Sequence, residues 1–285
     1  MVLLNKRNLE EKIFETLMLV SVFIVISSLV IIISVIIFNG ATSLSIEMLT
    51  QTASGGFYLG RGGGILNSIL GSLFLALPAT ILAYLISIGV AIYLQRDFTH
   101  RSVSGFVRLS LDILWGIPSI VYGIFCLTIM IALGIGESLL FGIIALTLLE
   151  IPIITRSIDE SIKMVPHGLK EGAYSIGSTK FETATKVVRK QAMPGILAGV
   201  LLGLGRGIGD AASILFTTGY SDRIPTSLFD STAALPTTIY HIFQMPYPSV
   251  QHKAYAAAFV LLIIVLLISI ISRTLSKKST KYVVK

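Results

Sequence analysis

Two charged side chains, Arg206 and Asp210, interrupt an otherwise apolar stretch of the sequence. They stand four positions apart, so on a helix they share a face and can neutralise each other. An unpaired charge in the middle of a bilayer costs on the order of several kcal/mol. The planar guanidinium of Arg206 can also bind two oxygens of an oxyanion at once. Two interpretations stay open, a structural ion pair and a hydrophilic path for an anion.

Three glycines accompany these charges, at Gly199, Gly203 and Gly207. On a continuous helix the glycines and both charges fall on one face, about 100° wide. Small residues spaced by four allow another helix to approach closely. We therefore predict that this face packs against protein or lines a path, and does not meet lipid.

A polar segment, residues 156–193, precedes this stretch. Antiparallel helices can be joined by about 2–8 residues, so a longer segment has structure of its own. Gly168–Ile176 is expected to form a short helix that stops at Gly177. Thr179 and Glu182 have the spacing of a capping box for the next helix. We predict a docking element for a partner, with a solvated surface hairpin as the alternative.

The composition indicates a membrane protein. Hydrophobic residues make up 54% of the 285 and charged residues 13%, whereas soluble domains carry about 25% charge. Disorder requires low hydrophobicity and high net charge, so it is excluded. One cysteine excludes a disulfide scaffold, and four histidines suggest no metal cluster. We expect no metal, no bound cofactor and no catalytic residue.

The elements that position these residues are predicted to be membrane helices. A bilayer core needs roughly 20 apolar residues per helix. The first apolar stretch, 16–38, exceeds the roughly 7–15 residues of a signal-peptide core, so we expect an uncleaved helix. Five further spans are expected, at about 65–94, 112–134, 138–155, 194–217 and 254–273.

The basic residues predict the orientation of these six spans. With the N-terminus inside, most of the 22 lysines and arginines fall on the cytoplasmic side, as the positive-inside rule requires. Both termini are then cytoplasmic in the cell membrane. Because topology accounts for the net charge of +7, no nucleic-acid binding is expected. Asp112 and Glu150 lie near predicted cytoplasmic helix ends, where we expect interfacial charges.

The chain is expected to consist of three parts. Residues 1–61 hold the N-terminal tail, the first span and an outside loop. Residues 62–275 form the core, with a cytoplasmic loop at 156–193 and an outside segment at 218–253. Residues 276–285 form a basic cytoplasmic tail.

The loop at 156–193 resembles the EAA motif of the permeases of ABC importers. Glu171, Gly172 and Ala173, followed by Gly177, match the beginning of that motif, with Gly172 in place of the second-position alanine. Further on, Arg189-Lys190 stands where the family has Leu-Pro. The match falls between the fourth and fifth predicted spans, where the family carries it.

Three further strings are similar to phosphate-importer permeases. They are GIPSIVYGIF at 116–125, MPGILAGVLLGLGRGIGDAA at 193–212 and LPTTIYHIF at 235–243. The last string favours the PstA-type subunit over its PstC-type partner. Where that subunit usually has Glu-Thr-Ala-Pro, this chain has Asp210 and then Ala-Ala-Ser.

The resemblance implies an all-α, type I (MetI-like) permease with six transmembrane helices. It also implies four other subunits or proteins: a PstC-type permease, two ATPase subunits that use ATP, and an extracytoplasmic phosphate-binding protein. The loop around Gly177 would be the coupling helix, and transport would proceed by alternating access. The chain has no G-x-x-x-x-G-K-[ST] sequence, so we expect no ATP hydrolysis by this subunit. The alternatives are a permease for sulfate, molybdate or tungstate, and a membrane enzyme or channel.

Overall fold

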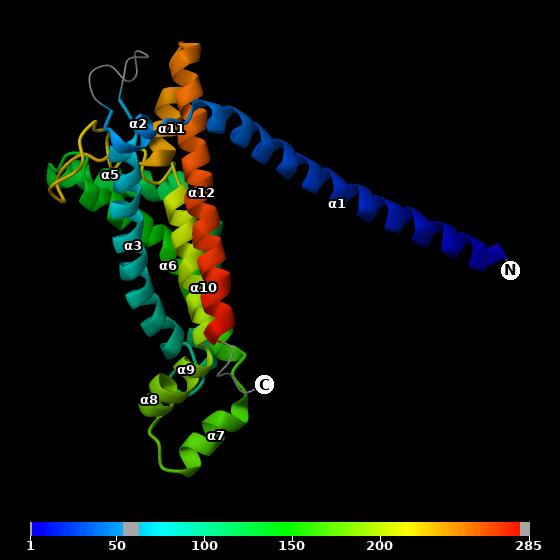
Figure 1. Ribbon diagram of the computed structural model, residues 1–285. Helices are drawn as coiled ribbons and strands as arrows, with labels where there is room; N and C mark the ends of the chain where they lie inside the picture. Colours follow the sequence, from blue (N-terminus) through cyan, green and yellow to red (C-terminus); the bar gives the residue numbers. More distant parts are fainter. Residues whose placement is uncertain (1, 54–62, 280–285) are drawn as a thin grey trace.

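The computed structural model describes residues 2–53 and 63–279, and all regular structure in these ranges is helical (Figure 1). Residues 54–62, most of them in the predicted outside loop, and the last tail residues 280–285 lie outside the described residues. In chain order the elements are α1 (Val2–Ser43), α2 (Ile46–Thr50), α3 (Leu66–Tyr93), α4 (Arg101–Gly116), α5 (Ser119–Leu133), α6 (Leu139–Lys163), α7 (His167–Ser175), α8 (Lys180–Glu182), the π-helical turn η2 (Thr183–Val188), α9 (Arg189–Gln191), α10 (Met193–Gly209), α11 (Leu235–Phe243) and α12 (Pro248–Ser279).

Four helices are long and apolar enough to cross a membrane, namely α1 from Glu10 onward, α3, α6 and most of α12. Two helix pairs reach the same criterion only together. One pair is α4 and α5, bent by 95°, and the other is 180–191 and α10, bent by 73°. The all-α prediction is confirmed, and six spans are reached when each bent pair counts as one.

The expected span at 112–134 is broken into two helices. α4 ends at Gly116, and Ile117 adopts an extended conformation with φ −70° and ψ 131°. Pro118 explains the break, because its ring disfavours the helical conformation in the residue before it. α5 then begins at Ser119 and ends at Leu133, and it is followed by Gly134, whose φ of +66° is the left-handed value that favours glycine.

The expected span at 194–217 is shorter than predicted. α10 ends at Gly209, and Asp210 is extended, with φ −83° and ψ 122°. The Asp210 carboxylate accepts hydrogen bonds from the backbone N–H and the hydroxyl of Ser213, three residues later. Aspartate often competes with the helix in this way by bonding to nearby backbone. Asp210 is therefore a cap, not a residue inside the helix.

Helix α6 is longer than the predicted span at 138–155 and runs on to Lys163. It lies at the centre of the bundle, beside α3 and α10, and α12 covers the other side of α10 (Figure 1). Its side chains are mostly buried over its whole length. The segment 156–163, expected in a loop, is thus the last two turns of a core helix.

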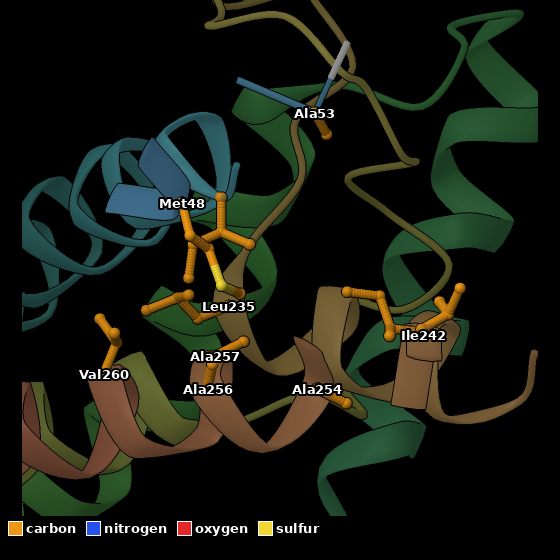
Figure 2. Packing of buried hydrophobic residues seen from close by; sticks show 10 residues of the cluster. Met48, Ala53, Leu235, Ile242, Ala254, Ala256, Ala257 and Val260 are labelled. Atoms are coloured by element: carbon orange, nitrogen blue, oxygen red, sulfur yellow. The ribbon is translucent and has the colours of Figure 1, made fainter. Parts of the chain in front are cut away.

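One end of the bundle is closed by an apolar cluster formed by α2, α11 and α12 (Figure 2). Met48, Leu235 and Ile242 are buried there against the alanine-rich start of α12. Near the same end, α1 meets α12 where Gly40 faces Tyr255 and Phe259. From there α1 extends away from the bundle with exposed apolar side chains (Figure 1).

Candidate functional site

An open groove between α10 and α12 contains both predicted path residues. It has a volume of about 1000 Å³ and is lined by Arg206 and Asp210 on one side. The α12 side contributes serines and the basic residues Arg273 and Lys277, and Trp115 of α4 also contacts the groove. A basic side chain in a partly apolar groove is a suitable contact for a small anion.

Arg206 and Asp210 both line this groove, but they are not bound to each other. Asp210 bonds to Ser213, with 2.8 Å between its carboxylate and the Ser213 backbone nitrogen. Across residues 2–53 and 63–279, no ion pair joins Asp210 to Arg206. The i,i+4 pairing fails because the helix ends between the two residues. The guanidinium of Arg206 is exposed in the groove.

The three glycines face α6. A Cβ on Gly199 would lie 2.5 Å from Ser157 Cβ, and one on Gly203 would lie 2.7 Å from Ile154 Cδ1. A Cβ on Gly207 would overlap the carboxyl group of Glu150. The face predicted as one surface is therefore divided. The glycines are buried against α6, whereas Arg206 lies at the edge and faces the groove.

Glu150 is not an interfacial charge, in contrast to the sequence-based expectation. Its side chain is fully buried, at 0% exposure. The expectation failed because α6 continues to Lys163, which places Glu150 in the middle of the helix. Neither carboxyl oxygen has a hydrogen-bond partner within the part of the chain that the structure describes.

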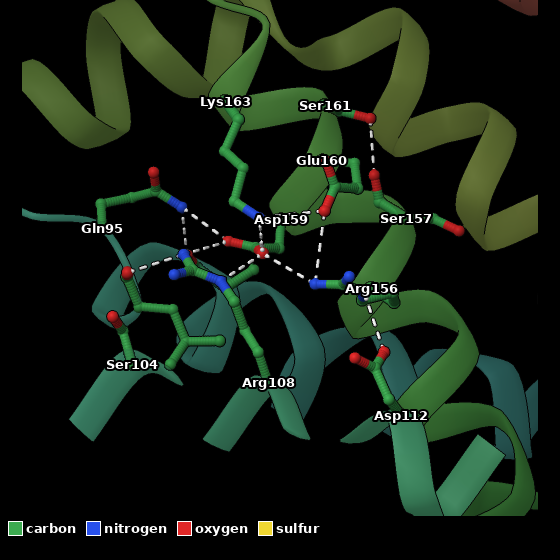
Figure 3. Close-up of polar contacts among 12 residues, drawn as sticks. Gln95, Ser104, Arg108, Asp112, Arg156, Ser157, Asp159, Glu160, Ser161 and Lys163 are labelled. Atoms are coloured by element: carbon green, nitrogen blue, oxygen red, sulfur yellow. Dashed lines mark hydrogen bonds and ion pairs between the residues drawn. The ribbon is translucent and has the colours of Figure 1, made fainter. Parts of the chain in front are cut away.

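A second buried carboxylate on α6, Asp159, is fully paired (Figure 3). The guanidinium of Arg108 in α4 donates to both of its oxygens, at 2.8 and 2.9 Å. Gln95 donates at 3.1 Å, and the Lys163 ammonium lies at 2.8 Å. Arg108 also donates to the carbonyl of Leu94 at 3.0 Å. Asp159 thus joins the end of α3, α4 and α6.

Arg156 extends this cluster to two more exposed carboxylates (Figure 3). It lies 3.0 Å from Asp112 of α4 and 3.3 Å from Glu160 of α6. Sequence reasoning did not identify this cluster. The i,i+3 and i,i+4 spacing of its α6 members was a visible signal, but Arg108 is 51 positions from Asp159 and only the fold brings them together.

The predicted docking loop follows α6 directly. α7 carries Glu171, Gly172 and Ala173, of which only Ala173 is buried. Gly177 has φ +86°, a left-handed conformation that explains a glycine at the end of α7. These positions confirm the short helix and its end at a glycine.

The expected capping box is also present at the start of α8. The Thr179 hydroxyl accepts from the Glu182 backbone N–H at 3.3 Å, and the Glu182 carboxylate accepts from the Thr179 N–H at 3.2 Å. Beyond the box, η2 and α9 lead to Ala192, where the chain bends by 73° into α10. The loop and the groove helix are therefore consecutive parts of one chain segment.

Comparison with known proteins agrees with this arrangement. Residues 87–281 match the family described as the inner membrane component of binding-protein-dependent transport systems. The chain belongs to this permease family. The groove helix α10, the loop that precedes it and the α4–α6 cluster of this permease all lie in the matched region.

Several relatives of this permease carry the name of one transport system. A "phosphate transport system permease protein PstA" from Yersinia pestis is 36% identical over 217 residues, 76% of this chain and 74% of the relative. A protein of the same name from Pasteurella multocida is 30% identical over 275 residues, 96% of this chain and 97% of the relative.

Solved structures show the same fold at low identity. A chain of the methionine transporter MetNI in an inward-facing conformation superposes with a TM-score of 0.61 at 19% identity, over 76% of this chain and 96% of that one. A chain of a bacterial alginate ABC transporter gives 0.62 at 12% identity, over 87% and 88%. These likenesses establish the fold of this permease as that of ABC-importer permeases.

Proposed function

We propose that this permease is a membrane subunit of an ATP-driven phosphate importer, with Arg206 as an anion contact in the translocation path. The observation that carries the proposal is the Arg206 guanidinium, which faces a groove and makes no ion pair with Asp210. The PstA relatives support phosphate as the anion.

The chemistry of the groove suits a transported oxyanion. A guanidinium presents a planar fork that matches two phosphate oxygens. The groove is open and largely apolar away from its few basic and hydroxyl side chains, so one such contact gives weak binding, as release on the far side requires. Glycine packing of α10 against α6 holds the helix that carries Arg206.

The loop between α6 and α10 is proposed to contact an ATPase subunit. Next to Gly177 it exposes two large apolar side chains, Ile176 at 84% and Phe181 at 69%. Exposed apolar side chains on a polar segment favour a protein partner. A movement imposed on this loop reaches Arg206 through α10. Glu171, Gly172, Ala173, Gly177 and Glu182 are the residues we assign to this coupling loop.

The remaining assignments follow from the same importer. A second, PstC-type permease would form the other half of the path, two ATPase subunits would use ATP, and an extracytoplasmic binding protein would deliver phosphate. This chain would bind no cofactor itself. Both termini would lie on the cytoplasmic side of the cell membrane, with the coupling loop.

Uptake by the reconstituted complex tests this function. Proteoliposomes that contain the permease with its partner subunits and phosphate-binding protein are expected to accumulate radiolabelled phosphate only when ATP is available to the ATPase. Complexes whose ATPase cannot hydrolyse ATP serve as the control. Uptake of sulfate, molybdate or tungstate but not phosphate would overturn the substrate, and uptake without ATP would indicate a channel.

A further inference from the structure

Glu150 is a fully buried carboxyl group without a hydrogen-bond partner in the described structure. It lies in the seam where α6 meets α3 and α10. From α10 it contacts the backbone at Gly207, and its other oxygen lies 3.7 Å from where a Cβ on Gly203 would be. From α3 the buried Thr80 hydroxyl lies close enough to act on Glu150 as a hydrogen-bond donor, although the two groups do not reach full hydrogen-bond geometry.

An ionised carboxylate in such surroundings is strongly disfavoured. A buried charge is tolerated when it is paired, and otherwise the group takes up a proton and becomes neutral. The side chains described around Glu150 supply no counter-ion. On α10 it lies against Gly203 and Gly207, and the intervening Arg206 faces the groove. On α3 it meets Thr80, and on α6 the nearest arginine, Arg156, is bound to Asp112 and Glu160.

We propose that Glu150 is a proton-binding site, which holds a proton while α10 is packed against α6 and releases it when the two helices separate. Separation would expose the carboxyl group to the groove that contains Arg206. In the packed state the bound proton is the only neutralising ligand, so it stabilises that state. The packed state of α6 and α10 is therefore stabilised at low pH, and this stabilisation is lost as the pH rises and the proton dissociates.

A separation of α10 from α6 at Glu150 would break no hydrogen bond of its carboxyl group within the described structure. At Glu150, α10 meets α6 through Gly203 and Gly207, whereas closer to the coupling loop Ile196 of α10 packs among the isoleucines of α6. Small shifts of one packed helix against another are one established kind of conformational switch. α10 is also continuous with the coupling loop through the bend at Ala192. This coupling role rests on the proposed import function, whereas the protonation of Glu150 does not.

Infrared spectroscopy of the whole transporter complex tests the proton directly, without substrate. A protonated, buried carboxyl gives a C=O stretching band that an ionised carboxylate lacks. We expect this band in the resting wild-type complex at neutral pH and its loss in Glu150→Gln. Glu47→Gln, which changes an exposed carboxylate on α2, is the matched control and should keep the band. An ionised Glu150 in the resting complex would overturn the proposal.

ATP hydrolysis by the same complexes tests whether the proton is linked to movement. The ratio of wild-type to Glu150→Gln rates removes the pH dependence of the ATPase itself. The ratio should be near one at low pH, where both side chains are neutral, and should depart from one as the pH rises. A ratio that stays flat with pH would overturn the linkage.

If Glu150→Gln does not assemble, Glu150→Met, which is also neutral, replaces it in both measurements. If the wild-type complex takes up no phosphate, the import function is contradicted, whereas the infrared result on Glu150 is unaffected.

Discussion

Asp159 and Glu150 are both fully buried on α6, yet their carboxyl groups differ in the number of polar contacts that they make. Asp159 receives hydrogen bonds or ion pairs from Arg108, Gln95 and Lys163, drawn from three parts of the chain. Glu150 receives none among the described residues and rests against glycines. A buried charge that is fully paired makes its surroundings rigid. An unpaired buried polar group costs free energy, and a movement that exposes the group to water removes that cost.

The difference indicates which end of α6 is held to its neighbours by polar contacts. At the α7 end, the Asp159 cluster ties α6 to α4 and to the end of α3. At the Glu150 end, contact is made by backbone and an unpaired carboxyl group. We infer that movement imposed through α10 is accommodated near Glu150 and Arg206, while the Asp159 cluster stays in place.

Removing the Asp159 charge should have the largest effect. Asp159→Asn leaves Arg108 and Lys163 without their shared carboxylate, and breaking a buried pair in this way costs about 3 kcal/mol. We expect a clear fall in the thermal unfolding temperature of the purified complex. Glu160→Gln, on the same helix but 52% exposed, is the control and should cost under about 1 kcal/mol. Equal stability of both variants would show that Asp159 is not an anchor.

Filling the other end of the seam should have an intermediate effect. In Gly207→Ala the new methyl group overlaps the Glu150 carboxyl, and overpacking of this kind costs about 1–3 kcal/mol. Gly209→Ala is the matched control, because nothing lies within 4 Å of that position. Shortening Glu150 to alanine in the Gly207→Ala background should restore part of the lost stability. No difference between the two glycine variants would contradict the tight contact with Glu150.

The smallest stability change is expected in the coupling loop, which lies beyond the Asp159 anchor. Gly177→Ala meets no neighbouring atom but must adopt a φ of +86°, which costs about 1 kcal/mol. The bundle should remain intact, while ATP hydrolysis that depends on the permease should fall. Gly168→Ala, in α7 and equally unobstructed, is the control. Unchanged coupled hydrolysis in Gly177→Ala would argue against contact between this loop and the ATPase.

Local signals in the sequence predicted local structure well. The capping box at Thr179 and Glu182 and the helix end at Gly177 depend on neighbouring residues alone, and both are present. The all-α membrane fold was also predictable, because each membrane helix requires a continuous apolar stretch that is visible in the sequence. The break at Pro118 was not predicted, because prolines are tolerated in membrane helices.

The features that depend on tertiary packing were not predictable in this way. Asp210 was placed on the helix because glycine and aspartate gave no indication of whether the chain would continue or turn. Glu150 was expected at an interface because the length of α6 depends on its burial among α3, α4 and α10. The pairing of Arg108 with Asp159 joins positions far apart in the chain, and periodicity carries no information about such contacts.

The most direct test of the central claim is the initial rate of ATP-driven phosphate uptake by complexes carrying Arg206→Ala. We predict a severe loss of uptake while the complex assembles normally, because the groove loses the guanidinium proposed to contact the anion. Since Arg206 and Asp210 are not paired, adding Asp210→Ala should not restore uptake. Arg206→Ala with uptake equal to wild type would contradict Arg206 as the anion contact, and recovery in the double variant would show that the two residues act as a structural pair.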